Sequence, residues 1–312
     1  MSDYNFSIKA TNVNKTYNKK NNQIKALIDF NISIPKGCIF GLLGPNGAGK
    51  STFINILGGL VKKNSGKINI SGIDIDTNPK ESRRKIGIVP QELNIDPFFT
   101  PIELLELQAG LYGVKKKNRK SEEILNNVGL IEQKNAYART LSGGMRRRLL
   151  VAKALVHSPE IVILDEPTAG VDVDLRNNLW KYIQILKKQG TTICLTTHYL
   201  EEAEYLCDFI SIVNKGKIIK NDSKKNILNL MAKKTAKFIL DKKDKIEIPQ
   251  NLKIFEPIIK DNTLTLTYDK NITQLKTIIE ILNHENIDFT EINTYESDLE
   301  DIFIDLVKKN DQ

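Results

Sequence analysis

The sequence contains little cysteine, histidine or tryptophan: its 312 residues include three cysteines, three histidines and one tryptophan. Cys38, Cys194 and Cys207 have no paired spacing, and the first two lie in apolar, strand-like runs. Buried, reduced thiols are therefore expected instead of disulfides, a metal site or a redox centre. The isolated histidines His157 and His284 also argue against a His-rich metal site.

Long hydrophobic runs are absent as well. No apolar stretch approaches the roughly 20 residues that a membrane-spanning helix needs. Residues 1–5 lack the charged-then-apolar pattern of a signal peptide. With 40% hydrophobic and 27% charged residues, the sequence predicts a folded, soluble protein, so that another chain supplies any membrane span.

The formal net charge is +8, which can indicate a nucleic acid or an anionic membrane surface as partner. The basic residues are spread along the chain, with short clusters at 115–117 and 146–148. Because they form no concentrated stripe, we expect a solvated surface and no nucleic-acid partner. The cluster at 146–148 begins a helix with an apolar face, and it fits either a solvated surface or contact with a nucleotide or partner.

Apolar strands alternate with helices through most of the chain, the pattern of a buried parallel sheet in an α/β fold. Leucines at helical spacing in residues 101–141 predict a helical subdomain, at about residues 95–155, inserted into this core. Strands are expected at 6–10, 32–34, 38–43, 68–70, 86–89, 161–164, 192–195, 209–213 and 217–219, and helices at 50–60, 175–188 and 200–206.

The composition shifts near residues 222–225, which predicts a second domain. Strands at 238–240, 264–266 and 289–292 and a helix at 272–282 indicate a small α+β fold. A capping box at 297–300 begins the last helix. We predict domains at residues 1–228 and 229–312.

One segment carries a complete phosphate-binding pattern. Residues 44–51 match G-x-x-x-x-G-K-[ST], after an apolar strand and before a helix. The glycines let backbone N–H groups surround phosphate oxygens, and the helix N-terminus favours negative charge. Lys50 is expected to reach the β- and γ-phosphates, and the Ser51 hydroxyl to bind Mg²⁺. The expected nucleotide-binding residues are Gly44, Pro45, Asn46, Gly47, Ala48, Gly49, Lys50, Ser51 and Thr52.

Two further elements fit the same chemistry. The apolar strand at 161–164 ends in Asp165, a candidate Mg²⁺ ligand, and Glu166, a candidate general base for the attacking water. The turn Ser142, Gly143 and Gly144 opens an amphipathic helix and forms a second anion site. One chain thus offers two phosphate-binding helix ends.

The sequence resembles the nucleotide-binding subunits of ABC transporters over roughly residues 6–220. The matching segments occur in the family's order: the phosphate loop 44–51, Gln91 in 89–92, the signature 141–145, then 164–168, 169–172 and 196–198. The resemblance implies a P-loop NTPase core with an antiparallel β subdomain and a helical subdomain. Runs 145–149, 195–204 and 297–303 resemble the exporter branch, often called type-2 ABC transporters. Met145 departs from the Gln that commonly ends the signature, and we expect ATP hydrolysis to survive this change.

The resemblance also implies partners and residue roles. Two copies would form a head-to-tail dimer, each ATP lying between the phosphate loop of one copy and the Ser142 turn of the other. A separate multi-span membrane permease would be driven from the cytoplasmic side. Gln91 would contact Mg²⁺ or the attacking water, and His198 would hydrogen-bond the γ-phosphate. Asp172 would work across the dimer interface, and Tyr17 would stack on the adenine.

The alternative is a soluble ABC-type ATPase acting in translation, DNA repair or iron–sulfur assembly. Repair members carry long coiled coils between the phosphate loop and the signature, whereas this interval is compact and has no sustained heptads. Translation factors usually carry two sets of motifs, and this chain has one. A dead ATP sensor is disfavoured because Lys50, Asp165, Glu166 and His198 are all present.

Overall fold

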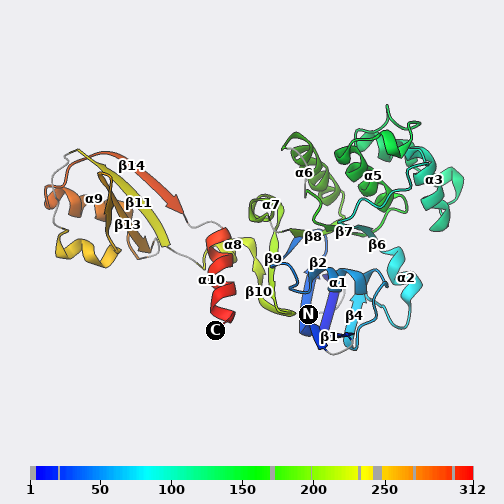
Figure 1. The fold of residues 1–312 in the computed structure, drawn as a ribbon, viewed down its shortest axis with the longest axis horizontal. Coiled ribbons are helices and arrows are strands. Elements are labelled where there is room, and N and C mark those ends of the chain that lie inside the picture. Colours follow the sequence, from blue (N-terminus) through cyan, green and yellow to red (C-terminus); the bar gives the residue numbers. More distant parts are fainter. Residues whose placement is uncertain are drawn as a thin grey trace. The chain divides into compact units, whose positions relative to one another are not determined.

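The computed structural model describes residues 5–19, 22–168, 173–197, 199–230, 233–241, 248–269, 272–296 and 299–311. The chain divides into two compact units, residues 1–224 and 225–312 (Figure 1). This division falls between residues 224 and 225, whereas the sequence places it at 228. Among the described residues, no helix is both long enough and apolar enough to cross a membrane.

The first unit begins with an antiparallel sheet in the order β2-β1-β4-β5. Its strands are β1 (Phe6–Lys19), β2 (Asn22–Pro35), β4 (Ser65–Ile70) and β5 (Ile73–Asp74). β1 and β2 far exceed the short strands predicted at 6–10 and 32–34. Register shifts along β1, with Asn12 at φ 47°, interrupt the two-residue period by which a strand is recognised.

A second, six-stranded sheet has the order β10-β9-β3-β8-β7-β6. Strands β6, β7, β8, β3 and β9 are parallel, and β10 pairs antiparallel with β9. The bounds are β3 (Ile39–Leu43), β6 (Ile86–Val89), β7 (Ile161–Asp165), β8 (Thr192–Thr197), β9 (Phe209–Asn214) and β10 (Lys217–Ser223). Every residue of β3, β7 and β8 is buried, which explains their continuous apolar runs.

The two sheets of the first unit share one apolar core around helix α1 (Lys50–Leu57). Phe53 of α1 and Phe30 of β2 are fully buried, with ring centroids 4.9 Å apart. The sequence predicted two of the other helices of the core, α6 (Val173–Lys188) and α7 (Leu200–Leu206). It did not predict α2 (Pro79–Arg84).

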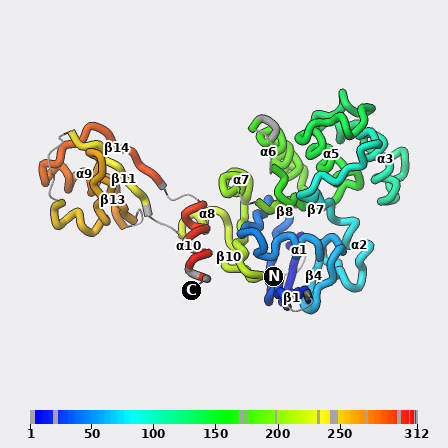
Figure 2. The backbone as a smooth tube through the Cα atoms, viewed as in Figure 1, coloured from blue at the N-terminus to red at the C-terminus, as the bar shows by residue number. Residues whose placement is uncertain are grey.

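The predicted helical subdomain consists of short helices joined by loops (Figure 2). It contains α3 (Pro101–Leu111), α4 (Ser121–Asn127) and α5 (Gly143–Leu155), with 3₁₀ turns Lys116–Asn118 and Ala138–Thr140. A capping box between Thr100 and Glu103 begins α3. Gly113 and Gly129, both at positive φ, follow α3 and α4 and stop the helical pattern.

The second unit is an α+β fold built on an antiparallel sheet in the order β12-β13-β11-β14. Helix α9 packs its Ile278 and Leu282 into an apolar core with Phe238 and Leu266. The elements are α8 (Lys224–Leu228), β11 (Lys233–Leu240), β12 (Ile258–Lys260), β13 (Thr263–Asp269), α9 (Leu275–His284), β14 (Phe289–Glu296) and α10 (Leu299–Asp311). Two residues of the predicted capping box, Ser297 and Asp298, lie outside the described residues.

Candidate nucleotide-binding site

The predicted site residues of the first unit follow the carboxyl ends of neighbouring parallel strands. The phosphate loop follows β3, Gln91 follows β6, Asp165 and Glu166 end β7, and His198 comes directly after β8. Ligands of open α/β sheets bind at this edge of the sheet. The sheet order therefore gathers segments that lie more than a hundred residues apart in the sequence.

The phosphate loop is shaped by close backbone approaches at two glycines. A Cβ at Gly44 would lie 2.3 Å from the Val213 carbonyl oxygen, and one at Gly49 would lie 2.5 Å from that of Ala26. Gly49 also has φ 112°, a conformation that favours glycine. Gly49 is the N-cap of α1, and no side chain caps the helix. The first N–H groups of α1 therefore remain available to an anion.

The Lys50 side chain folds over this loop. Its Nζ donates to the carbonyl oxygens of Gly44 at 2.6 Å and Pro45 at 3.2 Å, and the residue is buried. Burial lowers the pKa of Lys50, while the carboxylates of Glu166 and Asp165 oppose that shift. Lys50, the predicted phosphate-binding residue, thus interacts electrostatically with Asp165, the predicted Mg²⁺ ligand, and with Glu166, the predicted general base.

Asp165 and Glu166 are both buried at the end of β7, and β8 holds them in place. The Thr196 hydroxyl donates to Asp165 Oδ1 at 2.5 Å, and the backbone N–H of Glu166 lies 3.1 Å from the Thr196 carbonyl oxygen. Glu166 adopts φ 47°, which is uncommon for a residue other than glycine and is concentrated at functional sites. The regular strand conformation of β7 therefore ends at Glu166, the candidate general base.

Gln91 contacts Glu166 directly, as expected if both serve one site. The Gln91 Nε2 donates to Glu166 Oε2 at 2.9 Å across a separation of 75 residues. The amide oxygen of Gln91 is not used in this bond. The structure therefore brings together Gln91, Glu166, Asp165 and Lys50 from three separate segments.

Arg147 belongs to the basic cluster at 146–148, but the sequence did not predict its contacts with this site. It is 5% exposed, so the solvated-surface alternative does not apply to this residue. It donates to the carbonyl oxygens of Pro90 at 2.7 Å, Gln91 at 2.8 Å and Glu166 at 3.4 Å. Arg147 thus joins α5, which begins at the signature turn, to the segments that carry Gln91 and Glu166. Only its position two residues after Met145 could have drawn attention to it.

The signature turn itself is open on its outer side. Ser142 is the N-cap of α5, and its hydroxyl accepts the Met145 N–H at 3.2 Å. Ser142 and Gly143 are exposed, and no atom lies within 4 Å of a Cβ built at Gly143. The hydrogen bond to Met145 is within the turn and makes no link to the phosphate loop. The backbone around Ser142 and Gly143 thus leaves room for a ligand or a second chain.

Of the predicted residues Tyr17, Asp172 and His198, the structure describes only Tyr17. Tyr17, on β1, is half-buried, and the Lys15 ammonium lies 4.9 Å from its ring centroid. Asp172 and His198 lie outside the described residues, so their predicted roles stay predictions. The single tryptophan, Trp180, is buried on α6.

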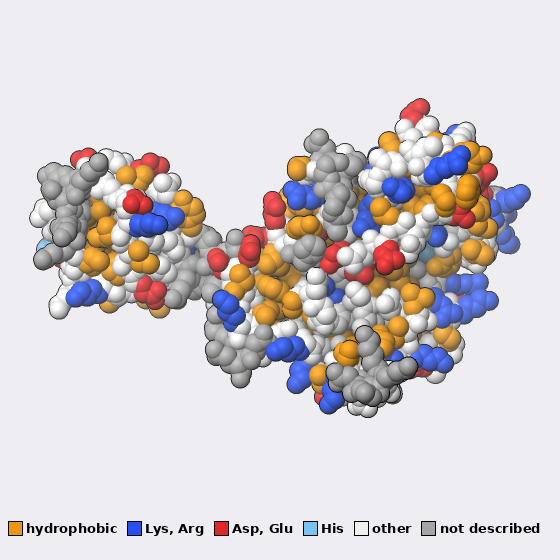
Figure 3. Space-filling model, viewed as in Figure 1, with side chains coloured by type: hydrophobic (Ala, Val, Ile, Leu, Met, Phe, Trp, Pro, Cys, Tyr) orange, Lys and Arg blue, Asp and Glu red, His pale blue; other side chains and the backbone are white. Residues whose placement is uncertain are grey.

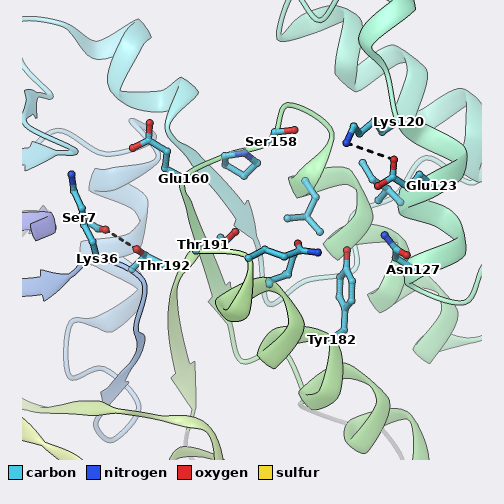
Figure 4. Close-up of a pocket in the computed structure, with 16 residues that line it drawn as sticks. Ser7, Lys36, Lys120, Glu123, Asn127, Ser158, Glu160, Tyr182, Thr191 and Thr192 are labelled. Atoms are coloured by element: carbon cyan, nitrogen blue, oxygen red, sulfur yellow. Dashed lines mark hydrogen bonds and ion pairs between the residues drawn. The ribbon is translucent and has the colours of Figure 1, made fainter.

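A polar cavity of about 450 Å³ lies at the opposite edge of the parallel sheet (Figure 4). Its lining includes Glu160, which precedes β7, and Thr192, which begins β8. Two pairs of its polar groups contact each other: the Ser7 and Thr192 hydroxyls lie 2.7 Å apart, and Lys120 lies 3.7 Å from Glu123. The position of this cavity separates it from the phosphate loop.

On the face shown in Figure 3, Lys and Arg side chains are mixed with apolar and acidic ones, with one group at the end that carries α2 and α3. Within the described part of the chain, no group of three or more His, Cys, Asp or Glu residues could hold a metal ion by itself. The cysteines Cys38, Cys194 and Cys207 are buried and free, as expected.

Comparison with known proteins identifies relatives of this chain. Residues 27–169 match the ABC transporter family. The linearmycin resistance ATP-binding protein LnrL of Bacillus subtilis is 42% identical over 214 residues, 68% of each chain. The daunorubicin resistance ATP-binding protein DrrA2 of Streptomyces coeruleorubidus is 30% identical over 311 residues, covering 96% of this chain and 95% of the relative.

Solved structures agree with these relatives. A dimeric, post-hydrolysis ATP-binding cassette, MJ0796 with ADP and Pi, matches with a TM-score of 0.62 and 30% identity, covering 69% of this chain and 98% of the other. An ATP-binding subunit of an ABC transporter matches with a TM-score of 0.64 and 26% identity, covering 72% and 92%. These similarities confirm the predicted fold class, and the chain belongs to the ATP-binding, ATP-hydrolysing proteins of ABC transporters, in their exporter branch.

Proposed function

We propose that this ATPase holds MgATP at the carboxyl edge of its parallel sheet, with the γ-phosphate between Lys50 and the signature turn of a second copy. The observation that carries the proposal is the cluster of Lys50, Asp165, Glu166 and Gln91, together with an exposed Ser142 turn that no described residue covers. The uncapped N-terminus of α1 and the loop N–H groups bind the phosphates. Tyr17 stacks on the adenine.

The donor groups beside the phosphate loop suit Mg²⁺. Ser51, Asp165 and Gln91 offer a hydroxyl, a carboxylate and an amide oxygen, and Mg²⁺ prefers oxygen ligands shared with substrate phosphates. When bound, the ion neutralises charge that develops on the phosphate oxygens. Thr196 keeps the Asp165 carboxylate oriented through its hydroxyl.

Glu166 acts as the general base in this proposal. Its backbone is fixed by Thr196 and its carboxylate by Gln91, so that the oxygen that receives the proton from water is held at a defined place. A base positioned in this way contributes about 10²- to 10⁴-fold to the rate. His198 contacts the γ-phosphate, and Asp172 acts across the dimer interface.

The proposed assembly is a head-to-tail dimer that works beneath a separate membrane permease on the cytoplasmic side. The dimeric state of the related MJ0796 cassette supports the dimer. The export and resistance roles in the names of relatives, among them the Nod factor export ATP-binding protein I of Cupriavidus pinatubonensis (40% identity over 193 residues), support an exporter partner. ATP binds the closed dimer better than the open one and therefore shifts the population toward closure.

The Glu166→Gln variant tests this proposal. The amide retains the shape of the side chain but is not a base. We therefore expect the variant to bind MgATP without turnover and to accumulate as a dimer. Size-exclusion chromatography with MgATP measures the dimer, and phosphate release measures turnover. Ser142→Arg, added to the same variant, places a large cation in the open turn and should abolish the dimer while the monomer still binds nucleotide.

Two outcomes separate the parts of the proposal. A Glu166→Gln protein that hydrolyses ATP at the wild-type rate would remove Glu166 from the role of base. A Ser142→Arg, Glu166→Gln protein that dimerises as well as Glu166→Gln alone would show that the signature turn does not face the second nucleotide. Stimulation of turnover by RNA or DNA, and not by a membrane partner, would favour the soluble alternative.

A further inference from the structure

One buried carboxylate, in the run 195–204, has no predicted role in nucleotide binding or hydrolysis. Glu202, on α7, is 1% exposed. Its Oε1 accepts the Thr168 hydroxyl at 3.1 Å and the Trp180 indole N–H at 3.0 Å. Burial raises the pKa of Glu202, and the nearby Thr197, Trp180 and Thr168 side chains oppose that rise, although its Oε2 is buried without a hydrogen-bond partner among the described residues. A buried carboxylate is costly to maintain, so its partners are the place to look for its role.

The partners of Glu202 flank the segments that carry the proposed chemistry. Thr168 lies two residues after Glu166 and directly before residues 169–172. Trp180 belongs to α6, which begins directly after residue 172. Thr197 is the last residue of β8, directly before His198. One side chain is therefore bonded on both sides of the segment that contains Asp172 and faces the residue before His198.

The Trp180 ring makes two further contacts. The Arg176 guanidinium lies 5.2 Å from the centroid of the Trp180 ring, and the Tyr205 ring stacks on it with centroids 4.9 Å apart. Arg176 belongs to α6 and Tyr205 to α7, so the two helices are joined by this stack as well as by the Glu202 bond. The indole position is thus fixed relative to the carboxylate.

We propose that Glu202 is a positioning residue, whose bonds to Thr168 and Trp180 fix the segments carrying Glu166, Asp172 and His198 for ATP hydrolysis. This inference rests on the proposed function of those three residues. Glu202 does not touch the nucleotide in this proposal. It holds the spacing between the end of the Glu166 segment and the start of α6, and small misplacements of reacting groups cost large factors in rate.

The test compares Glu202→Leu with Glu202→Gln. Leu fills a similar space but accepts no hydrogen bond, and we expect kcat to fall about tenfold or more. The KM for MgATP should stay within about twofold, because the phosphate loop is untouched. Gln supplies one amide oxygen, and the single atom Oε1 serves both donors, so Glu202→Gln should recover most of kcat. Glu201→Leu, at the exposed neighbouring position, is the matched control and should behave as wild type.

Trp180 supplies an independent readout because it is the only tryptophan in the chain. MgATP should change its emission in the wild-type protein and in Glu166→Gln, and Glu202→Leu should lose that response. Thr168→Val and Trp180→Phe each remove one donor. If Glu202→Leu does not fold, these two variants replace it, and each should lower kcat with little change in KM.

The outcomes distinguish this proposal from the one on which it rests. Wild-type kcat in Glu202→Leu, or in both Thr168→Val and Trp180→Phe, would overturn the positioning role while leaving Glu166 as base. An equal loss in Glu202→Gln and Glu202→Leu would also overturn it, because the acceptor would not be the cause. Continued hydrolysis by Glu166→Gln would instead remove the proposed function itself.

Discussion

The two units of this chain differ in what their interiors contain. In the first unit, charged and hydroxyl side chains such as Lys50, Arg147, Asp165, Glu166 and Glu202 are buried among apolar residues. In the described part of the second unit, every buried side chain is hydrophobic, and its core is made of residues such as Phe238, Leu266 and Ile278. Burying polar groups costs free energy unless they are bonded, so their presence marks where the chain does chemistry. Substitutions in the first unit should therefore lower ATP turnover far more than substitutions in the second.

Lys50→Ala should have the largest effect on turnover. Removing a cation aimed at the transferred phosphoryl group is expected to lower ATP turnover by about 10²- to 10³-fold. Phosphate release at saturating MgATP and nucleotide binding by calorimetry measure the loss. Lys67→Ala, at an exposed position of β4, is the control. Turnover near the wild-type level in Lys50→Ala would exclude Lys50 from the site.

Arg147→Met should have a smaller effect, mainly on kcat. Without the guanidinium, the carbonyl oxygens of Pro90 and Gln91 lose their donor and the Gln91 segment shifts relative to Glu166. We expect kcat to fall about tenfold, since the bonds of Arg147 orient the segments that carry Gln91 and Glu166. Steady-state kinetics measures the change. Lys153→Met on the same helix should be near neutral, and an equal loss in both variants would assign the effect to α5 in general.

Phe238→Ala should leave turnover unchanged and destabilise only the second unit. Phe238 is fully buried, and truncating such a side chain costs about 3–5 kcal/mol. Limited proteolysis and thermal unfolding should show early loss of residues 225–312, with ATP hydrolysis by the full chain retained. A parallel loss of ATP turnover would show that the second unit contributes to catalysis.

His157 should give the smallest effect, visible only in the pH dependence of stability. Burial lowers the pKa of His157 below its ordinary value, and its ring stacks on Tyr112 with centroids 3.7 Å apart. The unfolded chain therefore binds the proton more readily, so stability falls as the pH drops below about 6.5. His157→Gln should flatten the decline in melting temperature between about pH 7.5 and 5.5, a change of a few degrees. An identical pH profile in the variant would contradict this assignment.

The sequence predicted the contiguous motifs but missed the contacts between residues that are far apart in the chain. The phosphate loop, the end of β7 and the signature turn were found because each motif is contiguous. The lengths of β1 and β2 were missed because bulges interrupt their period. Arg147 and Glu202 lie in the runs 145–149 and 195–204 that resemble the exporter branch, but the sequence did not predict their contacts. Their partners lie tens of residues away, at Pro90 and Gln91 for the first and at Thr168 and Trp180 for the second. The roles of Ser142 and Asp172 across a dimer stay predictions.

Photocleavage with MgADP and vanadate tests the central claim most directly. Vanadate occupies the place of the γ-phosphate, and ultraviolet light cuts the backbone beside it. If the terminal phosphate lies between Lys50 of one copy and the Ser142 turn of the other, mass spectrometry should find cuts near both segments. The cut at the phosphate loop serves as the control for binding. Cleavage at that loop alone, with the chain intact around Ser142, would contradict the account.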